Sequence, residues 1–333
     1  CGGDEASGSA HDMSRVQAFL STCRLWRDQW RRAAIALLVV LGAITAGTAW
    51  LLRDPLPHFL ARRSTLVSVS VDSTRIEDSY HLEFVRLVAQ SGLRVDLTVR
   101  RALADSGRRL PVAVGLGGYV SGRSAIRWLG DTQGVLVAAL AYPFAGHVRP
   151  SPLTFVREIP KIRAAFLDTP PAVMLALDYL LQRPDVDRSR VEAVGVSLGA
   201  PFMCIAAALD RRFTRAWAVH GSGGSYAPLE MNMRRTIPLA PLRLPAAVIA
   251  NVIIAGPRLD PVRWVGRIAP RPFVMVNAEG DQQMPRASVE ALYQSAAAPK
   301  ELRWVSGKHV RPNPEVIKAL AGIVMEQIRR DAR

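Results

Sequence analysis

Hydrophobic and polar positions alternate in short runs along most of the chain, but one long segment near its beginning is apolar throughout. Residues 33–52, AAIALLVVLGAITAGTAWLL, carry no charged side chain. At about 1.5 Å per residue, a helix of this length crosses the roughly 30 Å hydrocarbon core of a bilayer. A core helix of a soluble domain normally has a polar face, and a signal peptide has a shorter apolar region. The pattern therefore predicts one transmembrane helix from Ala33 to Leu52.

Arginines on the two sides of this helix predict its orientation. Within windows of similar length, five precede the helix (Arg15, Arg24, Arg27, Arg31 and Arg32) and three follow it (Arg53, Arg62 and Arg63). Because the more basic flank stays in the cytoplasm, we expect a single-pass signal anchor. The long C-terminal portion would then face the periplasm or the exterior.

Residues 1–32 form a basic N-terminal tail before the helix, and they contain two of the three cysteines. Cys1 has two interpretations: the lipid-modified first residue of a lipoprotein, or the cut end of a longer or misassigned reading frame. We favour the second, because Met13 begins a plausible shorter protein that still contains the membrane helix. Cys1, Cys23 and Cys204 have no CxxC spacing, so we expect neither a disulfide framework nor a zinc site.

After a linker at residues 53–65, short β-branched runs alternate with segments of helical period, which is the pattern of an α/β domain over 66–333. The strand candidates are 66–71, 81–89, 93–100, 111–117, 134–142, 191–197, 214–221, 271–280 and 301–307. Helix candidates are 170–183, 198–212, 286–298 and 314–330, two of which begin with proline near the first turn. The first strands, with a connection at Ser91 and Gly92, indicate an antiparallel start.

The net charge of +15 would suggest a nucleic-acid partner, but its distribution does not. Of 43 basic residues only Lys161, Lys300, Lys308 and Lys318 are lysines. The arginines are scattered, and no basic run is interleaved with aromatic residues. The composition is typical of a coding bias, and we expect no nucleic-acid binding.

The segment VEAVGVSLGA places Ser197 between Gly195 and Gly199, at the end of a predicted strand and directly before an apolar helix. In this context GxSxG forms a nucleophile elbow, a sharp turn that small flanking residues permit. The alternative is a strand-to-helix turn that merely needs small residues. We favour a nucleophile, with the Leu198 amide at the helix start available to an oxyanion.

A serine nucleophile needs a base and an acid to orient that base, and both follow in the order Ser, Asp, His. Asp281 comes just after one predicted strand, and His309 just after the next. Glu279 is the alternative acid, but it lies closer to its strand and has less reach. His220, in VHGSGG, precedes the acid and so breaks the chain order, and we expect it in a loop or pocket wall.

The second oxyanion donor should come from the loop after an earlier strand of the sheet. The stretch GLGGY, residues 115–119, is suited to this role, with the amide of Gly118 or Tyr119 as the donor. The alternative is a flexible glycine turn with no role in binding.

From about Leu66 to Arg330 the chain resembles the α/β-hydrolases. The run LDYLLQRPDVDRSRVEAVGVSLGA is similar to the dienelactone hydrolase and acetyl-ester hydrolase branch, with relatives among prolyl oligopeptidases and acyl-CoA thioesterases. RIAPRPFVMVNAEGDQQMP resembles the acid loop of the same group. The resemblance implies a mostly parallel eight-stranded sheet with helices on both faces, a triad of Ser197, Asp281 and His309, and no metal or organic cofactor. Where many relatives have His-Gly in the oxyanion loop, this chain has Gly117 and Gly118.

An apolar insertion at about 226–265 separates two predicted strands, and it is either a lid over the active site or extra core packing. Its composition indicates a hydrophobic group in the substrate, or contact with the bilayer. We expect a membrane-anchored serine carboxylesterase acting on a small-molecule ester. The alternatives are a thioesterase or peptidase of the same fold, and a catalytically inactive binding protein.

Overall fold

The computed structural model describes residues 5–118, 122–146, 152–309 and 314–331, and it divides into two compact units, Cys1–Arg53 and Asp54–Arg333. The first unit consists of helix α1 (Glu5–Leu51), which contains the predicted span except for its last residue. Within α1, Gln29–Leu51 has a mean hydropathy of 2.1, and none of its most apolar window is buried. By length and composition this segment is able to cross a membrane. A signal sequence near the N-terminus has the same length and composition.

The second unit is built on one mixed sheet of nine strands, one at each strand candidate. The eight-stranded sheet that the family resemblance implies is one strand short. The strands are β1 (Leu66–Glu77), β2 (Tyr80–Ala89), β3 (Arg94–Ala102), β4 (Leu110–Leu116), β5 (Leu136–Leu140), β6 (Val186–Val196), β7 (Arg215–Val219), β8 (Phe273–Ala278) and β9 (Lys300–Val305). Their order is β1-β2-β3-β5-β4-β6-β7-β8-β9. Strand β1 runs well beyond the predicted end at Val71. The prediction missed its second half because this part is a polar, exposed edge with no hydrophobic alternation.

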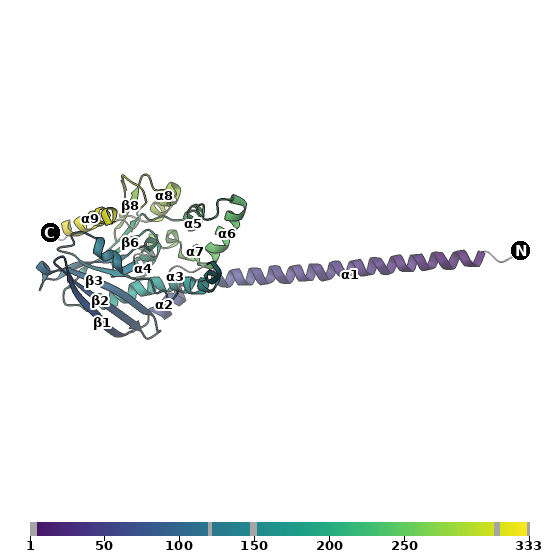
Figure 1. Ribbon diagram of the computed structural model, residues 1–333, viewed down its shortest axis with the longest axis horizontal. Coiled ribbons are helices and arrows are strands. Elements are labelled where there is room, and N and C mark those ends of the chain that lie inside the picture. The colour runs from purple at the N-terminus through teal and green to yellow at the C-terminus, as the bar shows by residue number, and fades with distance from the viewer. Residues whose placement is uncertain (1–4, 119–121, 147–151, 310–313, 332–333) are drawn as a thin grey trace. The chain divides into compact units, whose positions relative to one another are not determined.

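The first strands are antiparallel and the rest of the sheet is parallel. A two-residue turn at Asp78 and Ser79, both with positive φ, joins β1 to β2, and this conformation matches the twist of a hairpin. Strand β3 then pairs antiparallel with β5, and every pair from β5 through β4, β6, β7 and β8 to β9 is parallel. The predicted antiparallel start and mostly parallel sheet are thus confirmed (Figure 1).

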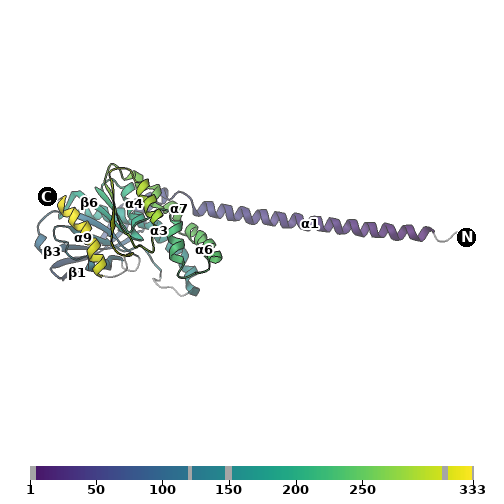
Figure 2. The same ribbon diagram turned by 90° about the horizontal axis from the view of Figure 1, so that it is seen from above.

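Helices cover both faces of the sheet, as predicted. One face packs against α2 (Leu56–Arg63), α3 (Pro152–Leu180), α4 (Gly199–Leu209) and α8 (Arg286–Ser295). The other face packs against α9 (Pro314–Arg330), shown in yellow over the strands in Figure 2, and against the short 3-10 helix η2 (Gly122–Trp128). The carboxyl ends of the parallel strands are left for loops, which is where sites gather in such sheets.

Helix α3 is longer than the predicted helix at 170–183. The prediction took Pro170 and Pro171 as the start of a helix, but these two residues and Pro160 lie inside α3. Each proline removes one backbone donor, which normally breaks a helix. Here the following turns, from Ala172 to Leu180, are almost fully buried against the sheet. Burial of this apolar face outweighs the lost hydrogen bonds.

Residues 53–65, expected as a linker, contain helix α2, which packs against α3. Phe59 is fully buried. The carboxylate of Asp168 on α3 accepts hydrogen bonds from Arg62 at 2.9 and 2.7 Å, and it lies 2.8 Å from Nε2 of His58. The second unit therefore begins structurally at Asp54, before the first strand.

The insertion at 226–265 forms α5 (Tyr226–Met233), α6 (Ala240–Ile253), α7 (Gly256–Leu259) and two 3-10 helices, η3 (Pro261–Arg263) and η4 (Val265–Arg267). In Figure 1 the three α-helices lie together beside α4, at the end of the sheet where the loops gather. Several large apolar side chains of this segment are more than 45% exposed: Leu239, Leu242, Val248 and Ile249.

Candidate active site

Ser197 lies in the turn between β6 and α4, with a left-handed backbone at φ 53°. This strained conformation is rare for a residue with a side chain. The Ser197 amide donates to Val219 O at 2.8 Å, which ties the turn to the neighbouring strand β7. A Cβ on Gly195 would lie 2.5 Å from Ala200 Cα, so the turn requires a glycine there.

The three residues predicted as a triad lie in one hydrogen-bonded chain. The Ser197 Oγ lies 2.8 Å from Nε2 of His309, and Nδ1 of His309 lies 2.7 Å from Oδ2 of Asp281. The side chains of His309 and Asp281 are only 5% and 4% exposed. Glu279, the alternative acid, is exposed and takes no part in this arrangement.

His220 contacts the same carboxylate, which the sequence reasoning did not predict. It follows β7 with φ 51°, its side chain is 1% exposed, and its Nδ1 lies 3.0 Å from Oδ2 of Asp281. Its ring packs edge-on against that of His309, with centroids 5.0 Å apart. The signal in the sequence was the place of His220 at the end of one predicted strand, since Asp281 follows the end of the next strand along the chain.

Asp281 is the common acceptor of this cluster. Burial opposes ionisation of its carboxyl, but hydrogen bonds from His220, His309 and the Gln283 amide outweigh it and hold the pKa of Asp281 well below its usual range. Since the carboxylate is ionised, Nδ1 of both histidines must carry the proton and donate it. Nε2 of neutral His309 is therefore an acceptor for the Ser197 hydroxyl.

The backbone beside the serine contains the two regions predicted for the oxyanion. Leu198 is the residue before α4 and lines the pocket at Ser197. Gly118 is half-buried in the loop after β4, and Tyr119 lies outside the described residues. A Cβ on Gly199 would lie 2.0 Å from Leu116 O, so only glycine allows α4 and this loop to approach so closely.

A cavity of about 340 Å³ opens at Ser197, and its lining is mostly apolar. The sheet side contributes Phe166, Leu198, Pro201 and Phe202, while the insertion contributes Pro228, Leu229, Asn232, Ile254, Leu259 and Pro261. The insertion therefore forms one wall of this cavity. The volume is at the lower end of the roughly 300–1,000 Å³ range of small-molecule sites.

Comparisons with known proteins agree with this architecture. No protein-family model matches the sequence, and no curated protein matches it. Among solved structures, acetyl xylan esterase 1 from Thermoanaerobacterium sp. JW/SL YS485 superposes with a TM-score of 0.56 at 15% identity, covering 83% of this chain and 94% of that one. Acetyl xylan esterase from Paenibacillus sp. R4 gives a TM-score of 0.55 at 20% identity, covering 80% and 90%. The chain has the α/β-hydrolase fold.

A further solved structure, a cold-adapted esterase from an Arctic intertidal metagenomic library, gives a TM-score of 0.51 at 15% identity and covers 79% of this chain and 100% of that one. Acetyl xylan esterases and other esterases among the neighbours agree with the acetyl-ester hydrolase resemblance of the sequence. In the α/β-hydrolase fold the nucleophile elbow follows a central strand, as Ser197 follows β6 here.

His220, Asp281 and His309 are also the group of described residues whose ligand atoms lie close enough for a metal ion, within 4.8 Å of one another. However, both Nδ1 atoms are at hydrogen-bonding distance from a single carboxylate oxygen. The two N–O distances, 3.0 and 2.7 Å, are those of hydrogen bonds and are short for two ligands spread tetrahedrally around a zinc ion at about 2.0–2.2 Å. We interpret the cluster as a hydrogen-bonded one.

Proposed function

We propose that the chain is a serine hydrolase of carboxylic esters, held at a membrane by the helix at Gln29–Leu51. The observation that carries this proposal is the chain of contacts from Ser197 Oγ to His309 Nε2 at 2.8 Å and from His309 Nδ1 to Asp281 at 2.7 Å. A serine so placed has a base within reach and an acid that fixes the tautomer of that base.

In the proposed reaction, Ser197 Oγ attacks the ester carbonyl while His309 Nε2 takes its proton. Asp281, ionised and buried, stabilises the imidazolium that forms. The amides of Leu198 and of the region Gly118 to Tyr119 would bind the oxyanion. The imidazolium then protonates the leaving alcohol, and a water activated by His309 hydrolyses the acyl-enzyme.

Esters of short acyl groups are the proposed substrate class. The cavity at Ser197 is mostly apolar and about 340 Å³, which suits a small hydrophobic acyl group. Two of the similar structures are named acetyl xylan esterases, which adds support for an acetyl or other short acyl group. A thioester or an amide would fit the same machinery, so the leaving group must be tested directly.

Membrane attachment rests on the apolar segment Gln29–Leu51, with a mean hydropathy of 2.1 over a window that is not buried. The excess of arginine before the uncharged stretch Ala33–Leu52 favours a cytoplasmic N-terminus. The hydrolase domain would then lie in the periplasm or outside the cell, tethered within a few residues of the bilayer.

The test compares wild type with Ser197→Ala for fluorophosphonate labelling and for hydrolysis of nitrophenyl acetate, butyrate and palmitate. Labelling and hydrolysis lost together in the variant would support the nucleophile, and the highest activity should fall on the short esters. A folded wild type that neither labels nor turns over any ester, thioester or peptide amide would overturn the proposal. It would instead favour a binding protein with a hydrolase fold.

A further inference from the structure

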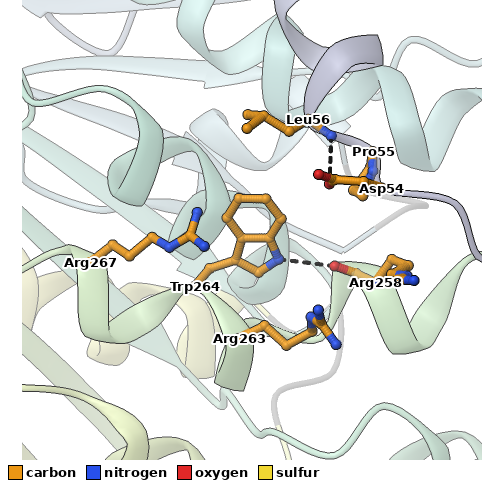
Figure 3. A pocket seen from close by; sticks show the side chains of 7 residues that line it. All are labelled: Asp54, Pro55, Leu56, Arg258, Arg263, Trp264 and Arg267. Carbon is orange, nitrogen blue, oxygen red and sulfur yellow. Dashed lines mark hydrogen bonds between the residues drawn. The ribbon is translucent and has the colours of Figure 1, made fainter.

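A second pocket, of about 410 Å³, lies in the hydrolase domain away from the triad and gathers positive charge. It is lined by Asp54, Pro55 and Leu56 at the start of the domain and by Arg258, Arg263, Trp264 and Arg267 of the insertion. Figure 3 shows the Trp264 indole in the middle, with Arg267 on one side and Arg263 and Arg258 on the other. The lining thus contains three arginines and one aspartate.

The charges in this pocket are only partly neutralised. Within the described ranges, neither Arg263 nor Arg267 forms an ion pair, and both residues are exposed. Asp54 accepts a hydrogen bond from the Leu56 amide at 3.1 Å. Asp260, the nearest acid in the sequence, instead accepts from the amides of Gly224 and Ser225. A net positive pocket therefore remains, and guanidinium groups suit phosphate oxygens.

The aromatic floor of the pocket is held rigidly. Trp264 is 5% exposed, and its indole N–H donates to Arg258 O at 2.9 Å. The guanidinium of Arg267 lies 4.9 Å from the centre of the Trp264 ring, which orients it by a cation–π contact. Arg267 is thus oriented against a fixed aromatic ring, which lowers the entropy that its side chain loses when an anion binds.

Resting on the proposed membrane attachment, we propose that this pocket binds the phosphate group of an anionic lipid. Asp54 follows the candidate span, which ends at Leu51, by three residues, so the pocket lining begins at most about 10 Å of chain beyond it. The insertion that supplies the arginines also exposes Leu242, Val248 and Ile249 on α6. Basic and apolar groups presented together are typical of a surface that meets anionic lipid.

The test uses the full chain in nanodiscs of phosphatidylcholine, with and without phosphatidylglycerol, and measures hydrogen exchange over residues 256–267. Phosphatidylglycerol should slow exchange by about fivefold, the effect of one basic residue near an anionic surface. The double variant Arg263→Gln with Arg267→Gln should lose this protection. The control, Arg188→Gln with Arg211→Gln, removes the same charge from exposed positions elsewhere and should behave as wild type.

Two outcomes overturn the inference: no protection by phosphatidylglycerol, or equal protection in the double variant. Protection by inorganic phosphate in phosphatidylcholine discs would show that a free anion, and not a lipid, is the occupant. Extraction of the chain from vesicles by alkaline carbonate would refute the anchor alone. In that case flotation of wild type and double variant with phosphatidylglycerol vesicles still decides the pocket, and ester hydrolysis enters none of these readouts.

Discussion

Nδ1 of His220 lies 3.0 Å from Oδ2 of Asp281, the same oxygen that Nδ1 of His309 contacts at 2.7 Å. A single carboxylate oxygen therefore accepts from two histidines, one of which also contacts the candidate nucleophile. His220 does not reach Ser197 in this arrangement, so we regard it as a positioning residue that fixes Asp281.

Replacing His220 by leucine should lower kcat about tenfold to a hundredfold with little change in KM, because a hydrogen bond to a charged group contributes about 1.5–3 kcal/mol. His220→Asn retains a donor close to the Nδ1 position and should recover most of the activity. Steady-state kinetics on nitrophenyl acetate make the comparison. A rise in KM alone, or equal losses in both variants, would contradict the positioning role.

Gly199→Ala should impair both folding and catalysis. The added Cβ would lie 2.0 Å from Leu116 O and so must push the loop after β4 away from α4. Such overpacking costs about 1–3 kcal/mol of unfolding free energy. The unfolding free energy and kcat should both fall. In the control Gly322→Ala the new Cβ meets nothing within 4 Å, so kcat should stay unchanged, and the unfolding free energy should rise by about 0.5–1 kcal/mol because Gly322 lies inside helix α9.

Leu229→Trp should shorten the range of esters accepted. Leu229 belongs to the insertion and lines the cavity at Ser197, so a larger side chain there reduces a volume of about 340 Å³. Nitrophenyl butyrate should lose at least about tenfold in kcat/KM, in line with 1–3 kcal/mol per methylene in a filled pocket. Acetate should be nearly unaffected; an equal loss on both esters would mean that the insertion does not select the acyl group.

Glu192 should make the protein less stable as the pH rises. Burial raises the pKa of this carboxyl, although the Trp217 indole N–H and Arg215 oppose the shift. Its raised folded pKa contributes stability below the ordinary value of 4.5, and this stability is lost as the pH rises through the folded value. The Tm of Glu192→Gln, measured from pH 4 to 8, should therefore gain on that of wild type toward the upper end.

Asp168 has the opposite sign. Burial would raise its pKa, but the hydrogen bonds from His58 and Arg62 prevail and lower it. Its contribution is thus present above the unfolded pKa of about 3.9 and is lost as the pH falls through the lower folded value. Asp168→Asn should cost about 1.5–3 kcal/mol at neutral pH, the contribution of hydrogen bonds to a charged group. Hydrogen exchange should show reduced protection of the backbone amides of α2. Unchanged protection there would contradict a role of Asp168 in holding α2 against α3.

The sequence predicted the parts of the site that depend on order along the chain. Ser197, Asp281 and His309 each follow a recognisable strand, and strand ends of a parallel sheet meet at one edge. The contact of His220 with Asp281 depends on β7 lying between β6 and β8, which spacing alone does not reveal. Reasoning from chain order set His220 aside as the base, and chain order carries no information about its contact with the carboxylate of Asp281.

Elements with weak local signals were the least predictable. The second half of β1 is polar because it is an exposed edge, so it has no alternation to recognise. Helix α3 passes through Pro170 and Pro171, which read as a helix start, because the buried turns after them hold the helix against the sheet. In both places tertiary contacts override local preference.

The candidate nucleophile and its candidate base differ in how firmly the sheet holds them. Ser197 follows β6, which is hydrogen-bonded to β4 on one side and β7 on the other, whereas His309 follows β9, the outermost strand, paired with β8 alone. Outer strands open more readily than central ones, with little loss of the remaining structure. Mild denaturation would therefore separate His309 from Ser197 by fraying β9. The central sheet would stay intact, and Ser197 would keep its place at the end of β6 without the imidazole beside it.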